Sequence, residues 1–264
     1  MQIFIINLDR SPDRLAFMRG QAERLDFEFE RVAAVNGLDV PSWLSDEFAG
    51  PHSLFPGEVG CFASHLIAAK QIVSRDLDAA IVMEDDAVLP SDFMAIVENA
   101  VKVAPTGWDV IHLCSLFKKS VISIDYLESG RRLVRYTQWP ASAVAYVLSN
   151  RGARKVLSTR QRILPLDIQT RYAWRQGLDI VGVYPAPVTQ RGTFSTTVRV
   201  GARRASKPWL AGPFSLFYGA MWTARKIGVS AYIQGIAWNY VNSTRKYLGW
   251  PSRVAIIDRS GIER

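Results

Sequence analysis

Cysteine and histidine are scarce in this sequence, which narrows the chemistry that it can support. It contains two cysteines and three histidines among 264 residues. Cys61 and Cys114 stand apart in apolar surroundings, so we expect buried free thiols and no disulfide framework. The histidines are scattered along the chain, which argues against a zinc site made of histidine and cysteine.

Long apolar runs are also missing. No stretch offers about 20 uninterrupted apolar residues, so no transmembrane helix is expected. The N-terminal run 1–7 lacks a charged leader region and is too short for a signal peptide, so it is predicted to form a first strand. Cytoplasmic localisation is the resulting expectation. Internal repeats and low-complexity segments are absent.

The chain is rich in apolar residues and carries excess positive charge. Hydrophobic residues make up 48% and charged residues 21%, as is typical of a globular protein with a substantial core. The net charge of +8 predicts an anionic partner, which composition alone leaves open between nucleic acid, anionic lipid and a phosphorylated small molecule.

Strand and helix patterns alternate through residue 190. Strands are expected at 2–7, 29–35, 79–83, 109–113, 141–148 and 178–184, and helices at 12–25, 57–73, 91–103, 150–157 and 167–176. Residues 38–56 are expected to be a connection, and 115–138 short strands with a turn at 129–130. The alternation predicts an α/β fold with a mixed, largely parallel sheet flanked by helices.

Three consecutive carboxylates, Glu84, Asp85 and Asp86, follow the buried strand predicted at 79–83. Like charges this close raise one another's pKa, and burial raises it further. A divalent cation such as Mn²⁺ or Mg²⁺ removes that cost, because both ions prefer carboxylate oxygens and share them with substrate phosphates. Ligands of open α/β sheets bind at the carboxyl ends of strands, where this triplet lies. A solvated acidic turn before a helix is the alternative.

A polar loop after the first predicted strand carries Asp9, Arg10 and Arg14 to the same kind of position. The two arginines can hold phosphates. A surface ion pair with Asp9 or Asp13 is the alternative role for them.

Residues 191–264 differ from the rest. A basic cluster at 199–207 precedes an aromatic-rich stretch, 209–241, that is expected to be helical and that includes Arg225 and Lys226. Such a segment suits the surface of an anionic bilayer, where Trp and Tyr lie at headgroup depth. A subdomain packed on the sheet and a nucleic-acid surface are the alternatives.

Four stretches together resemble glycosyltransferase family 25, which contains bacterial lipooligosaccharide galactosyltransferases and animal procollagen galactosyltransferases. They are INLDR at 6–10 with Asp13-Arg14, GEVGC at 57–61 with SHL at 64–66, IVMEDD at 81–86, and AYVLS at 145–149 with GA at 152–153 and PLD at 165–167. The match covers residues 2 to about 190 and is specific only as a set.

The resemblance implies a GT-A-like catalytic domain over 1–190. The composition of residues 191–264 adds the expectation of a segment that associates with a membrane surface. The resemblance also implies inverting transfer of a hexose, most often galactose from UDP-galactose, to lipooligosaccharide, lipopolysaccharide or another glycan. Mn²⁺ or Mg²⁺ would be held by Asp86 and Glu84, and Asp167 would be the general base that takes the acceptor proton. Further donor contacts are assigned to Asn7, Asp9, Arg10, Arg14, Ser64, His65, Lys70, Glu84 and Asp85, with Asp85 on the ribose.

Alternatives remain for single residues and for the whole chain. Asp167 can instead be a helix N-cap, and His65 can pack in the core. Many GT-A enzymes complete the metal site with a late histidine or aspartate, but after Tyr184 this sequence offers Gln190 and then no carboxylate before Asp258. The whole-chain alternatives are UDP-glucose as donor, a non-catalytic binding protein, and a metal-dependent phosphoesterase. We expect an anionic membrane surface as a partner and no nucleic acid. The expected location is therefore the inner face of the cytoplasmic membrane.

Overall fold

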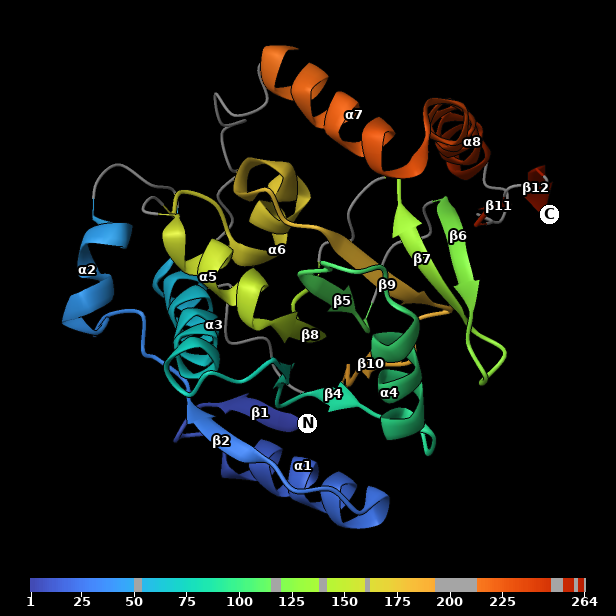
Figure 1. Ribbon diagram of the computed structural model, residues 1–264. Coiled ribbons are helices and arrows are strands. Elements are labelled where there is room, and N and C mark those ends of the chain that lie inside the picture. Colours follow the sequence, from blue (N-terminus) through green and yellow to red (C-terminus); the bar gives the residue numbers. More distant parts are fainter. Residues whose placement is uncertain are drawn as a thin grey trace.

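A ten-stranded mixed sheet forms the centre of the protein, with helices on both of its faces (Figure 1). The computed structural model describes residues 1–49, 54–114, 120–137, 142–159, 162–192, 213–247, 254–258 and 261–263. The strand order is β12-β11-β6-β7-β9-β5-β8-β3-β1-β2, and β10 pairs with β4 in a small second sheet. The expected α/β architecture with a mixed, helix-flanked sheet is confirmed.

The elements follow the predicted order closely up to residue 190. The strands are β1 (Gln2–Asn7), β2 (Glu30–Ala33), β3 (Ala79–Glu84), β4 (Ala87–Val88), β5 (Val110–His112), β6 (Val121–Tyr126), β7 (Arg132–Tyr136), β8 (Ala145–Ser149), β9 (Ile180–Tyr184), β10 (Thr189–Gln190), β11 (Ile256–Asp258) and β12 (Gly261–Glu263). The helices are α1 (Pro12–Leu25), α2 (Ser42–Phe48), α3 (Pro56–Ser74), α4 (Phe93–Val103), α5 (Asn150–Ser158), α6 (Leu166–Gln169), the 3₁₀ helix η1 (Thr170–Gln176), α7 (Pro213–Ile227) and α8 (Val229–Tyr247).

Alternate side chains of β1 separate two hydrophobic cores. Ile3 and Ile5 pack with residues of α1 and α4 on one face of the sheet. Phe4 and Ile6 pack with residues of α3, α5 and η1 on the other. Because side chains of a strand point alternately to opposite faces, an uninterrupted apolar strand such as β1 is expected only where both faces are covered.

The pairing of the first three strands determines where the site forms. β2 and β3 flank β1, and both run parallel to it, so Asn7, Ala33 and Glu84 end at one edge. Antiparallel pairing begins on the far side of β3, where β8 lies between β3 and β5. The parallel pairs are therefore β2–β1, β1–β3, β5–β9 and β6–β11, and the remaining pairs of the large sheet are antiparallel.

Two expectations about elements are wrong. The connection predicted at 38–56 contains the helix α2, whose Leu44 and Phe48 are buried against α3. This seven-residue helix is too short to give a clear periodic pattern. The helix predicted at 167–176 is divided into α6 and the 3₁₀ helix η1. Among the described residues, no helix is both long enough and apolar enough to span a bilayer.

The start of α3 lies very close to the loop after β2. The Ser64 hydroxyl accepts a hydrogen bond from the backbone N–H of Val35 at 2.8 Å and donates to the carbonyl of Gly60 at 2.6 Å. A Cβ atom on Gly60 would lie 2.4 Å from the carbonyl oxygen of Val35 and 2.9 Å from the nitrogen of Gly37. Glycine is therefore required at position 60 for this approach.

Gly60→Ala is expected to destabilise the fold by about 1–3 kcal/mol, because the helix must move away from a backbone that cannot yield. Urea unfolding measures this change. Gly20→Ala is the matched control, since a Cβ there meets nothing within 4 Å in the interior of α1 and is expected to add about 0.5–1 kcal/mol of stability. Equal stabilities of G60A and the wild type would show that α3 can shift freely.

Candidate active site

A cleft of about 210 Å³ opens at the carboxyl ends of β1, β2 and β3. Arg10 and Arg14 line it from the loop and helix that follow β1, and Ser64 and His65 line it from α3. Glu84 and Asp85 enter from the end of β3. The structure thus brings together the acidic triplet, the first polar loop and the 64–65 motif, although they are far apart in the sequence.

Arg14 lies between two members of the acidic triplet. Its guanidinium contacts Oδ1 of Asp85 and Oδ2 of Asp86, each at 3.0 Å. Asn7 donates a second hydrogen bond to Asp85, at 2.7 Å. Because β3 ends at Glu84, residues 85 and 86 form a turn and both carboxylates face Arg14. Strand geometry ends at Glu84, so the alternation of side chains along a strand does not set the direction of Asp86.

Asp86 is a buried carboxylate with unused hydrogen-bonding capacity. Its side-chain Oδ2 accepts from Arg14 and from Nε2 of Gln190, both at 3.0 Å, while Oδ1 has no hydrogen-bond partner among the described residues. Burial, followed by the charge of Glu84, raises the pKa of Asp86 to about 6. Burial also raises the pKa of Asp85. A cation in contact with Asp86 would relieve this cost.

Gln190 reaches the triplet through the pairing of β10 with β4, in which Gln190 lies opposite Ala87. The backbone N–H of Arg191 also donates to the carbonyl of Asp86, at 2.9 Å. Gln190 is therefore in direct contact with the acidic turn. It is the residue that the sequence offers in place of a late histidine or aspartate. No local pattern in the sequence indicates that contact.

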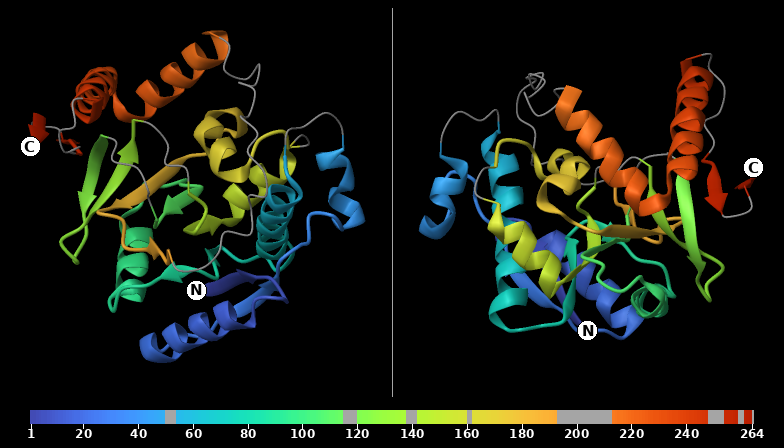
Figure 2. Two further views of the ribbon diagram at one scale, coloured as in Figure 1. Left: turned by 180° about the vertical axis from the view of Figure 1, so that it is seen from behind. Right: turned by 45° about the horizontal axis from the view of Figure 1, so that its top comes forward.

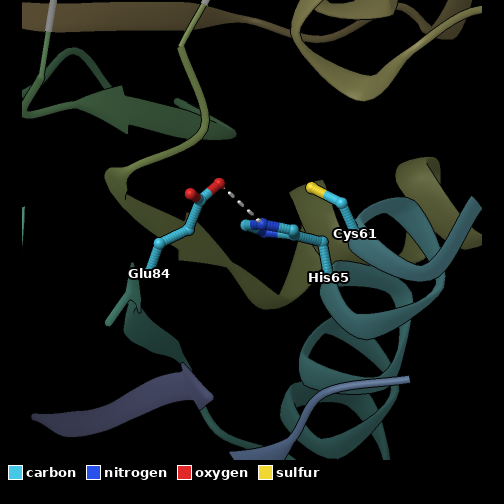
Figure 3. Close-up of side chains that lie close together, drawn as sticks. All are labelled: Cys61, His65 and Glu84. Atoms are coloured by element: carbon cyan, nitrogen blue, oxygen red, sulfur yellow. Dashed lines mark ion pairs between the residues drawn. The ribbon is translucent and has the colours of Figure 1, made fainter. Parts of the chain in front are cut away.

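Cys61, His65 and Glu84 form a second group of potential ligands beside the triplet (Figure 3). One ligand atom from each lies within 4.8 Å of the others. His65 is 3% exposed, with Nδ1 2.8 Å from the hydroxyl of Tyr146 and Nε2 3.5 Å from Oε1 of Glu84. His65 thus belongs both to the packed interior and to the wall of the cleft.

Cys61 is free, as expected, but the expectation of a buried apolar site is wrong for it. The residue is only half-buried and lines the cleft. Burial of the thiol and the neighbouring carboxylates of Glu84, Asp167, Glu58 and Asp86 raise its pKa well above the usual value, so the thiol stays protonated. Cys114 is free and buried.

The charge of Asp167 acts on the thiol of Cys61, which lines the cleft. Leu166, its neighbour in α6, packs against the hydrophobic cluster that includes Phe62 and Leu66 of α3. The N-cap of α6 is Pro165, and Asp167 lies in the first turn, so the alternative role as an N-cap is excluded.

Three other predicted donor contacts lie in different surroundings. Asp9 is exposed and forms an ion pair with Arg31, which also donates to the side chain and carbonyl of Asn7. Lys70 is exposed, with its ammonium 4.0 Å above the ring of Trp43, and it is not part of the cleft lining. Asn7 is buried and acts on the site through Asp85.

The sequence patterns indicated no role for Arg31 or Tyr146, and they did not indicate the contact between Gln190 and Asp86. Tyr146 belongs to the AYVLS motif, which marked the stretch but not the contact with His65. Arg31 lies within the short strand β2, and a single charged residue in such a strand does not indicate a role in a binding site. Each of the three side chains contacts a residue that is distant in the sequence. The periodicity of apolar residues along the chain does not reveal such contacts.

The donor set of the cleft fits a divalent cation. Asp86 offers a buried oxygen without a partner and Glu84 a partly exposed carboxylate, which are ligands of the kind that Mg²⁺ and Mn²⁺ prefer. The thiol and imidazole of Cys61 and His65 are close enough to suit a softer ion as well. Arg14 already supplies one positive charge to the two aspartates.

The family model described as "Glycosyltransferase family 25 (LPS biosynthesis protein)" matches residues 1–170. The chain belongs to this family, as the four sequence motifs indicated.

The curated relatives include proteins named inactive members of the family and proteins named galactosyltransferases. The mouse protein "Inactive glycosyltransferase 25 family member 3" is 30% identical over 185 residues, which cover 63% of this chain and 30% of that protein. "Procollagen galactosyltransferase 1-B" of Xenopus laevis is 29% identical over 189 residues, with coverage of 63% and 30%. The matched region thus spans about 30% of the length of these relatives.

Solved structures give only a distant likeness. The "crystal structure of a glycosyltransferase involved in the glycosylation of the major capsid of PBCV-1" has 8% identity and a TM-score of 0.35, and covers 69% of this chain and 82% of that one.

Proposed function

We propose that this protein is an inverting glycosyltransferase that transfers a hexose from a UDP-sugar, galactose from UDP-galactose, to a lipooligosaccharide, lipopolysaccharide or other glycan acceptor. The observation that supports it is a cleft lined by Arg10, Arg14, Glu84 and Asp85 in a chain of family 25, with Asp86 paired to Arg14. The charge of Asp167 acts on Cys61 in the wall of the same cleft. The sequence motifs alone do not show that these groups lie close together.

The basic and acidic groups of the cleft bind different parts of the donor. Arg10 and Arg14 line the cleft and bind the diphosphate, which suits the bidentate geometry of guanidinium groups. Glu84 and Asp86 would hold Mn²⁺ or Mg²⁺. The cation would supply stabilisation of the negative charge on the departing nucleoside diphosphate. Asn7 and Arg14 fix the orientation of Asp85 toward the ribose.

Asp167 serves as the general base. Inversion requires a base that takes the proton of the acceptor hydroxyl on the side opposite the leaving group. Asp167 comes from α6, whereas the triplet lies at the end of β3 and in the turn after it, so the two come from different parts of the fold. His65, held by Tyr146, orients Glu84.

A non-catalytic protein is the second candidate, and the names of the relatives favour it. Mammalian proteins similar to this chain, from mouse and human among others, are named inactive members of the family. In this chain Asp85 and Asp86 are both paired with Arg14, an arrangement that also stabilises the turn without a ligand.

A donor screen tests the two candidates. The protein is mixed with Mn²⁺ and UDP-galactose, UDP-glucose or other UDP-sugars, and melting temperature and UDP release are measured together. UDP-galactose with Mn²⁺ is expected to raise the melting temperature by several degrees at about 100 times its Kd, and EDTA to abolish the shift. If no UDP-sugar changes either quantity with or without metal, the non-catalytic reading replaces the transferase.

A further inference from the structure

The helices α7 and α8 lie on the outside of the molecule, beyond η1 and the β6–β7 hairpin (Figures 1 and 2). Their inner side is fixed to the sheet domain. Asn239 accepts hydrogen bonds from the backbone N–H and the hydroxyl of Ser120 and donates to Thr137 at 3.0 Å. Lys226 forms an ion pair with Asp179 at 2.8 Å. The two helices therefore hold a defined orientation.

Their outer side is apolar. Exposed large side chains include Phe217 and Met221 on α7 and Ile233, Ile236, Tyr240 and Tyr247 on α8. Ile233 is 60% exposed and Tyr240 76%. On α8 these positions are spaced by three, four and seven residues, which are helical repeats, so they form one stripe. No charged residue occurs between Val229 and Thr244. An ordinary surface helix carries charged and polar residues on its outer face.

The part of the sequence that contains this apolar face is basic. Between Tyr184 and Asp258 the sequence contains ten lysines and arginines and no aspartate or glutamate. Arg225 is exposed at the end of α7, and Arg245 lies near the end of α8. Two copies of such a face would repel each other, whereas an anionic lipid surface offers both complementary charge and an apolar layer.

We propose that the outer face of α7 and α8 docks on the surface of an anionic lipid bilayer, with the aromatic and aliphatic side chains at headgroup depth and the basic residues on lipid phosphates. Tyr218 of α7 packs on Trp174 of η1, with ring centroids 5.4 Å apart. η1 directly follows α6, which carries Asp167. The docked face is thus joined through η1 to the helix that carries Asp167.

Vesicle sedimentation tests the docking without any donor or acceptor, so its outcome is independent of the proposed transfer reaction. Binding is expected to vesicles of phosphatidylcholine mixed with phosphatidylglycerol, to weaken with added salt, and to be much weaker with phosphatidylcholine alone. The double variant Ile233→Gln, Tyr240→Gln is expected to reduce partitioning at least about tenfold. Arg225→Gln is expected to reduce it about fivefold, on anionic vesicles only.

Tyr126→Gln is the matched control, because Tyr126 is 61% exposed on β6, away from α7 and α8, and its loss should leave partitioning unchanged. Circular dichroism confirms that each variant is folded. Equal binding to neutral and anionic vesicles, or no effect of the double variant, would overturn the proposal. A solution dimer that the double variant converts to monomers, with no vesicle binding, would assign the face to a second copy instead. Salt-sensitive binding to an oligonucleotide with no vesicle binding would assign it to nucleic acid.

Discussion

Asp86→Asn is expected to lower the rate of sugar transfer by about 100- to 1,000-fold while leaving the fold intact. Asparagine keeps the size of the side chain and an acceptor oxygen for Arg14, but it removes the negative charge that holds the cation in the proposed site. Transfer is measured with UDP-galactose, Mn²⁺ and a glycan acceptor. The thermal shift produced by Mn²⁺ with UDP is expected to disappear as well.

The same substitution should stabilise the metal-free protein at neutral pH. The pKa of Asp86 is raised from 3.8 to about 6, so the ionised carboxylate is less favourable in the folded state than in the unfolded state. Its contribution to stability is present below about pH 4 and is lost as the pH rises through about 6. Unfolding of Asp86→Asn and wild type in EDTA should therefore differ at pH 7.5 and converge near pH 4.

Asp92→Asn is the control for this experiment, because it makes the same chemical change six residues along, at an exposed position with no side-chain capping bond. It should change neither transfer nor stability appreciably. A fully active Asp86→Asn enzyme would remove Asp86 from the metal site and leave Glu84, with Cys61 and His65, as the remaining ligand group.

Asp167→Asn is expected to lower kcat by about 100- to 10,000-fold and to leave donor affinity unchanged. An amide cannot take the proton of the acceptor hydroxyl, whereas the donor contacts lie on β1, α1, α3 and β3. Donor affinity is measured by calorimetry with UDP-galactose, and kcat by UDP release. The acceptor KM should change little, because the substitution preserves size and hydrogen bonding.

Asp46→Asn provides the comparison, since Asp46 is an exposed aspartate on the nearby helix α2. If Asp167→Asn keeps wild-type kcat, another group takes the proton. Weakened donor binding without a change in kcat would instead give Asp167 a role in holding the nucleotide sugar.

Much of the site could be located from the sequence because its parts follow strand ends. The apolar runs 2–7 and 79–83 appear as β1 and β3, and parallel pairing puts the polar residues after them at one edge. The Ser149 cap of α5, with its hydroxyl accepting from the N–H of Gly152 at 3.0 Å, is likewise visible as a local pattern. Patterns confined to a few neighbouring residues were sufficient for these predictions.

The remaining features depend on contacts between distant residues. The turn at 85–86 directs both aspartates to Arg14, 71 and 72 residues away, and no propensity of the acidic triplet encodes that direction. Gln190 reaches Asp86 across 104 residues through the two-residue strands β4 and β10. Such short pairings depend on the packing of the whole sheet, so they cannot be deduced from either segment alone.

The position of Arg14 between Asp85 and Asp86 bears on the order in which ligands bind. A UDP-sugar brings two negative charges and a divalent cation two positive ones, so their joint entry leaves the charge of the cleft unchanged. Entry of the UDP-sugar alone would add negative charge to a site where two carboxylates are already largely buried, and a bound cation offsets that charge. Cation and nucleotide sugar are therefore expected to bind cooperatively, each raising the affinity of the protein for the other by the same factor.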